Sequence, residues 1–159
     1  FMMKLRYKTT YTIVHALMAS PTEPMPERLR THQLGVMWKA LEGLRATNPS
    51  NVSNWRICSD AVNMMETLIE GGLCEDPDNL VADAITSLAM SGKRHIQKNE
   101  IYLDGPGMVH MRLIIESYEA MLCDLPHRTM IHCHIKTEKR MQDIFKGRRR
   151  AHDIEMVAV

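Results

Sequence analysis

Apolar side chains recur at intervals of three and four residues in five separate stretches of the chain, and this spacing restricts the possible fold more than any other feature. The five sets are Leu34, Met37, Leu41 and Leu44; Trp55, Cys58, Val62, Met65 and Ile69; Val81, Ile85, Leu88 and Ile96; Met108, Met111, Ile115, Tyr118 and Leu122; and Met130, His134, Met141, Ile144 and Phe145. Because residues three or four positions apart share one face of an α-helix, each set predicts an amphipathic helix.

Residues that stop or start helices lie between these stretches: Pro49, the pair Gly71 and Gly72, Asp76 before Pro77, Asp104 before Pro106, and Pro126. Proline disfavours the α conformation of the residue before it, glycine commonly follows a helix, and aspartate caps a first turn. The connections are short, which favours antiparallel neighbours. The sequence therefore predicts an all-α protein, an antiparallel bundle of about five helices with an extended basic N-terminal arm.

The chain divides into an arm, one domain and a tail. Residues 1–25 show no sustained periodicity and end in SPTEPMP, so we expect an extended arm. Residues 26–147 are expected to form a single helical-bundle domain, and residues 148–159 a C-terminal tail, with Asp76 and Pro77 starting the third helix. Several apolar sets repeat every seven residues, a pattern that packs equally well within one chain or between two chains. The sequence is therefore compatible with a homodimer as well as with a monomer.

The composition contains many methionines and few aromatic residues. Fourteen methionines and 5% aromatics mean that flexible thioether side chains make up much of the packing. No window approaches the roughly 18 apolar residues that span a bilayer, so we expect a cytoplasmic protein without membrane contact. The four cysteines include no CxxC pair, and free, buried thiols are expected.

Charge is distributed unevenly along the chain. The first 30 residues hold five cations and two acids, residues 31–126 hold seven cations and 13 acids, and residues 127–152 hold eight cations and two acids. Basic ends on an acidic body predict a directional electrostatic surface.

The stretch IHCHIKTEKRMQDIFKGRRR, residues 131–150, combines two histidines, a cysteine and many cations. At about 100° per residue of a helix, its apolar residues gather on one side and its cations on the other. We predict that the cationic side binds a partner or nucleic acid together with the basic arm. The predicted binding residues are Arg128, His132, Lys136, Lys139, Arg140, Lys146, Arg148, Arg149 and Arg150, with Lys4, Arg6 and Lys8.

A metal site at His132, Cys133 and His134 is an alternative for the same stretch. The two histidines lie two residues apart, about 200° around a helix, whereas helical chelation uses spacings of three or four. They would converge on one ion only if the stretch were an extended strand. We therefore predict no metal and no cofactor.

Two further motifs have structural explanations. LDGPG at Leu103–Gly107 lacks the GxxxxGK[ST] pattern of a phosphate-binding loop and predicts a turn followed by a helix cap. Asn63 and Glu66 lie one turn apart beside an apolar set, and we expect a hydrogen bond to a neighbouring helix before contact with a ligand. No catalytic arrangement can be assigned, so a non-enzymatic protein is predicted.

Four segments, RYK (6–8), MWKALEGL (37–44), AVNMMETL (61–68) and LDGPG (103–107), resemble in order and spacing a loose family of helical proteins. These short, mostly uncharacterised proteins are carried by proteobacterial phages, prophages and plasmids. The similarity covers about residues 5–145 and implies a mobile-element origin and a place in the cytoplasm of a bacterial host; it supplies no catalytic residue.

Two functions follow as expectations. The first is a non-enzymatic accessory protein that binds and blocks or tunes a host protein or nucleoprotein machine, such as a defence complex, in the manner of an anti-CRISPR inhibitor. The second is a DNA- or RNA-binding transcriptional regulator that uses the basic C-terminal helix, whose affinity would fall with salt.

Overall fold

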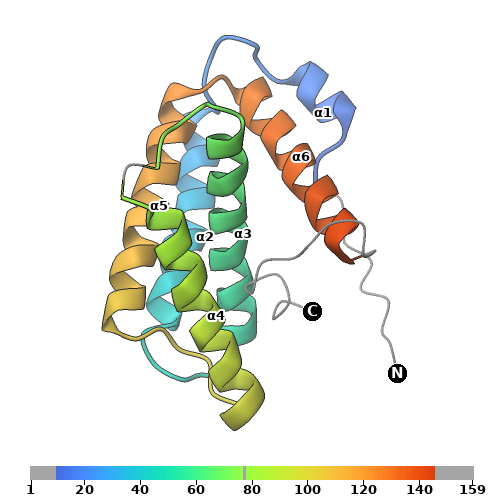
Figure 1. The fold of residues 1–159 in the computed structure, drawn as a ribbon. Coiled ribbons are helices and arrows are strands. Elements are labelled where there is room, and N and C mark those ends of the chain that lie inside the picture. Colours follow the sequence, from blue (N-terminus) through green and yellow to red (C-terminus); the bar gives the residue numbers. More distant parts are fainter. Residues whose placement is uncertain (1–9, 77, 146–159) are drawn as a thin grey trace.

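Four antiparallel helices form a ring in the computed structural model, which describes residues 10–76 and 78–145 (Figure 1). They are α2 (Glu27–Gly43), α3 (Asn51–Glu70), α4 (Leu80–Lys98) and α5 (Gly105–Asp124), and α5 closes the ring against α2. Outside the ring, α6 (His127–Phe145) packs on α3, and α1 (Ile13–Met18) packs on α6. The predicted all-α class is confirmed for the described residues.

The predicted apolar sets supply the core of the ring. Met111, Ile115, Tyr118 and Leu122 of α5 are fully buried, and most of the other predicted positions are buried with them. Ile96 is an exception, because the C-terminal end of α4 extends past its neighbours (Figure 1) and leaves this side chain exposed. All four cysteines are free thiols, as predicted, but the expectation that they are buried holds only for Cys58 and Cys133, since Cys74 is half-buried and Cys123 is exposed.

Aspartate side chains start two of the helices. At α5, the Asp104 carboxylate accepts a hydrogen bond from Gly107 N (2.8 Å), as the sequence predicted. The third predicted helix, α4, begins at Leu80 and not at Pro77. The chain first turns at Asn79, whose φ is 53°, and Asp76 reaches forward to accept from Leu80 N (2.8 Å) and Val81 N (3.2 Å).

A sixth helix, α1, lies within the segment that was predicted to be extended. Residues 13–18 are too few to show a periodic pattern, and a helix this short is stable only with tertiary contacts. Ala16 and Ala19 supply these contacts by packing against Ile131 of α6. The remainder of the predicted arm, residues 1–9 with Lys4, Arg6 and Lys8, lies outside the described residues.

Arg128 holds the C-terminal end of α1 against α6. Its guanidinium donates to the backbone oxygens of Ala16 (3.0 Å), Leu17 (3.0 Å) and Ala19 (3.2 Å). The last carbonyls of a helix have no partner within the helix, so these bonds replace the missing ones. Arg128 is therefore engaged within the fold, although it was predicted to belong to the outer cationic surface.

None of the helices seen in residues 10–76 and 78–145 combines the length and the apolar character that a membrane span requires.

Candidate functional site

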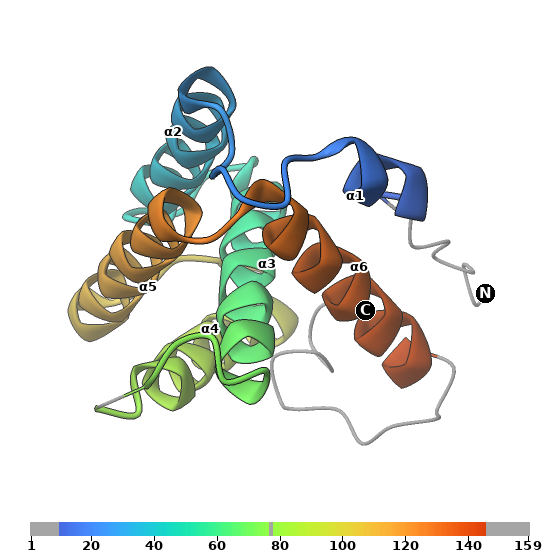
Figure 2. The same ribbon diagram turned by 90° about the horizontal axis from the view of Figure 1, so that it is seen from above.

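A cleft of about 1090 Å³ lies over α3, between α2 on one side and α1 with α6 on the other. Figure 2 shows α1 and α2 on opposite sides of α3 and α6, joined by the segment that crosses between them. Five methionines line the cleft, one from each of α1, α2, α3 and α6 and one from the crossing segment: Met18, Met37, Met64, Met141 and Met25. Its walls are therefore both apolar and adaptable in shape.

The apolar surface continues from the cleft onto its rim. Met18 of α1 and Leu29 and Val36 of α2 line the cleft and are also exposed to solvent. Contiguous exposed apolar surface rimmed by polar groups commonly marks a site of interaction with another molecule. The cleft is thus an open groove with an apolar margin.

A chain of neutral polar groups lies along the cleft. Gln33 Nε2 of α2 donates to the Tyr118 hydroxyl (3.0 Å), which lies 3.2 Å from His134 Nε2 of α6. The His134 ring also packs against Tyr11, with ring centroids 5.1 Å apart. Desolvation lowers the pKa of His134 to about 4, and burial raises that of Tyr118, so both groups are uncharged at neutral pH.

Three residues that line the cleft each have a buried acceptor atom without a hydrogen-bond partner among residues 10–76 and 78–145. These atoms are Ser59 Oγ and Asn63 Oδ1 of α3 and Glu138 Oε2 of α6. The other carboxylate oxygen of Glu138 accepts a hydrogen bond from Thr10 N (2.8 Å). The large majority of buried side-chain polar atoms are usually paired, so these unpaired atoms favour a ligand that supplies hydrogen-bond donors.

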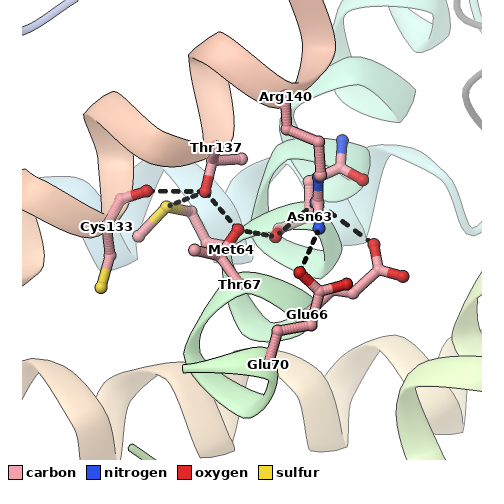
Figure 3. A network of polar contacts seen from close by, with 8 residues as sticks. All are labelled: Asn63, Met64, Glu66, Thr67, Glu70, Cys133, Thr137 and Arg140. Carbon is pink, nitrogen blue, oxygen red and sulfur yellow. Dashed lines mark hydrogen bonds and ion pairs between the residues drawn. The ribbon is translucent and has the colours of Figure 1, made fainter. Parts of the chain in front are cut away.

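A polar network fixes α6 on α3 beside the cleft (Figure 3). Arg140 of α6 lies 3.2 Å from a carboxylate oxygen of Glu66 and 3.7 Å from one of Glu70, and it donates to the Asn63 carbonyl (3.0 Å). Thr137 Oγ1 lies 2.6 Å from Thr67 Oγ1. Glu66 therefore contacts a neighbouring helix through an ion pair, where a hydrogen bond was predicted, and Asn63 does so through its backbone carbonyl.

The predicted cationic binding residues fall into three groups. His132, Lys136 and Lys139 are exposed on α6, as predicted for an outer surface. Arg140 is buried because Glu66 and Glu70 of α3 face it, and Arg128 is bound to α1, so these two do not belong to that surface. The remaining residues, Lys4, Arg6, Lys8, Lys146, Arg148, Arg149 and Arg150, lie outside the described residues.

The residues of the proposed metal alternative do not converge. Residues 127–145 are helical, which leaves His132 exposed, Cys133 buried and His134 in the cleft. In the part of the chain that the structure describes, no three His, Cys, Asp or Glu side chains are grouped to hold an ion.

The sequence did not predict the cleft. It arises from the relative positions of helices that are distant in sequence, and only the high methionine content signalled an adaptable surface.

Comparisons of the chain with protein-family models, with curated proteins and with solved structures found no match. The resemblance to mobile-element proteins therefore stays a prediction from the sequence.

His134 is expected to make stability depend on pH. An unfolded histidine takes up its proton near pH 6.5, whereas folded His134 does so only near pH 4. Lowering the pH from 6.5 to 4 therefore favours the unfolded state, by on the order of 3 kcal/mol at the lower limit. Urea unfolding across this range should show that His134→Gln loses this part of the pH dependence. His132→Gln, an exposed change on the same helix, controls for the substitution, and an unaltered profile in His134→Gln contradicts the assignment.

Arg140 is expected to stabilise the fold far more than an exposed arginine. Replacing it with methionine leaves the Glu66 carboxylate beside an apolar side chain, and removing one partner of a buried pair typically costs about 3–5 kcal/mol. The matched control is Arg45→Met, since Arg45 pairs with Glu42 at 2.9 Å on the surface and should contribute little. Urea unfolding measures both variants, and equal losses would refute a structural role for Arg140.

Proposed function

We propose that the chain is a non-enzymatic protein-binding module whose cleft holds one face of a cationic amphipathic helix from a partner protein. The observation that carries this proposal is the open, methionine-lined cleft with its exposed apolar rim. Its volume of about 1090 Å³ lies at the upper end of pockets that enclose small molecules, about 1,000 Å³, and its apolar surface continues outside. An occupant that covers both the cleft and the rim must be larger than a typical small ligand.

A helix fits this surface better than an extended strand. Amphipathic helices bind in hydrophobic grooves through residues spaced three and four apart, and methionine walls adjust to their side chains. Strand addition, in contrast, needs an exposed sheet edge, and the described residues form helices, turns and loops only.

The charge of the cleft selects a cationic helix. Among the described residues that line it are three carboxylates, Glu23, Asp60 and Glu138, and one guanidinium, that of Arg56, a net charge of −2 when the histidines are neutral. Complementary charge across an interface favours encounter with the right partner and disfavours others. The occupant is therefore expected to carry lysine or arginine where it contacts the cleft.

The chemistry of the site also supports binding over catalysis. Burial raises the pKa of the Cys58 thiol to about 12, so this cysteine is a poor nucleophile at neutral pH. Tyr118 and His134 are held in their neutral forms by desolvation. A host nucleoprotein machine as the source of the helix, and a mobile element as the source of the chain, remain proposals that rest on the sequence.

Nucleic-acid binding is a second candidate function, favoured by one observation. His132, Lys136 and Lys139 are exposed at four- and three-residue spacing along α6, so they share one face. A gel-shift titration at low salt tests it, and no shift with DNA or RNA would remove this candidate.

The helix-binding proposal predicts that a charged residue on the rim blocks docking. A fluorescein-labelled amphipathic helix of leucine and lysine should bind the wild-type protein, with affinity read by fluorescence anisotropy. Val36→Lys should weaken binding at least about tenfold, or 1.4 kcal/mol, because the apolar contact is replaced by a charge that needs solvent and that repels the lysines of the peptide. A matched helix of leucine and glutamate should bind less tightly than the lysine peptide.

Val109→Lys is the matched control. Val109 lies on α5 outside the cleft and is 45% exposed, compared with 42% for Val36. Binding by Val109→Lys should equal wild type. Equal weakening of peptide binding in both variants, or no peptide binding by the wild type, would contradict the proposal. If size-exclusion chromatography with light scattering shows a dimer, a second copy of the chain would be the occupant instead.

A further inference from the structure

We propose that Ser59, Asn63 and Glu138 form an anchor site in the cleft for one guanidinium or ammonium group of the docking helix. This inference rests on the proposed function and names the side chain that the cleft selects. A cationic side chain held at this site would let the cleft distinguish its partner from other amphipathic helices.

The anchor site is built from acceptors that the fold itself leaves unpaired. Ser59, Asn63 and Glu138 are 4%, 3% and 7% exposed and line the cleft, and each has an acceptor atom for which the described residues supply no hydrogen-bond partner. Buried polar atoms are unfavourable unless they are paired, so these atoms favour a ligand that brings hydrogen-bond donors.

The positions of the three residues suit a single ligand group. Ser59 and Asn63 lie one turn apart on α3 and so share a face, while Glu138 comes from α6, which packs on α3. Thr10 N holds one carboxylate oxygen of Glu138 at 2.8 Å, which orients the carboxylate and leaves Oε2 as its free acceptor. Residues with unpaired acceptors, from two packed helices, therefore line one cleft.

A cation is the ligand group that these acceptors favour. Guanidinium and ammonium groups carry only donors, and their hydrogen bonds to a carboxylate are stronger than neutral ones. Arg140 lies close by, at the Asn63 carbonyl, but its charge is matched by Glu66 and Glu70. The carboxylate of Glu138 disfavours an anionic ligand in the same place.

A pair of peptides tests the anchor directly. Each is an amphipathic helix with leucine on its apolar face and glutamine on its polar face, and one carries arginine at the centre of the apolar face where the other carries citrulline. Citrulline has nearly the same shape without the charge. Wild-type protein should bind the arginine peptide at least about tenfold more tightly than the citrulline peptide, which corresponds to 1.4 kcal/mol.

Glu138→Gln should remove this preference. The amide keeps an oxygen for Thr10 N but lacks the charge, so the ratio of the two affinities should fall to below about threefold. The control is Glu119→Gln, which changes an exposed carboxylate of α5 outside the cleft and should leave the ratio unchanged. Circular dichroism and urea unfolding confirm that each variant is folded.

The outcomes separate the anchor from helix docking. If wild-type protein binds both peptides equally, the anchor is refuted and helix docking stands. If neither peptide binds, helix docking is refuted. The anchor site is then tested on its own by titrating the protein with n-butylguanidinium and following the NMR signals of the Asn63 side-chain amide. The anchor is supported if n-butylguanidinium shifts these signals in the wild type, while n-butylurea does not and Glu138→Gln shows no shift. The absence of a shift in the wild type overturns it.

Discussion

The attachment of α6 to α3 is the interaction on which the rest of the structure depends. Arg140 extends from α6 to two carboxylates and a backbone carbonyl of α3, and Thr137 meets Thr67 beside it. Buried ionic contacts tolerate little displacement, because a misplaced partner leaves an unpaired charge. They therefore hold α6 at one position outside the four-helix ring, where apolar contacts alone would allow α6 to slide.

The cleft is a consequence of that position. Because α6 lies outside the ring, α3 is left uncovered between α6 and α2, and α1 extends the wall that α6 begins. Arg128 ties α1 to this wall through the carbonyls at its C-terminal end. The result is a groove with rigid attachment points and adaptable methionine walls, a combination suited to holding a helix.

The sequence predicted most of the helices correctly, but not which of their side chains the neighbouring helices cover. Apolar spacing identified five helices, because side chains that are buried along one face of a helix recur every three or four residues. The sixth helix, α1, was missed because it is too short to show such a period and depends on contacts with Ile131. Arg128 and Arg140 were assigned to an outer surface because spacing alone does not reveal which flank a neighbouring helix covers. The unpaired acceptors of Ser59, Asn63 and Glu138 come from two helices, so only the folded chain could bring them together.

Methyl NMR of methionine-labelled protein tests the helix-binding cleft most directly, because methionines lie both inside and outside it. On titration with the leucine and lysine helix, the account predicts shifts at the cleft methionines, Met18, Met25, Met37, Met64 and Met141, and none at Met90, which is exposed on α4. Shifts at Met90 with the cleft methionines unchanged, or no shifts at saturating peptide, would contradict it.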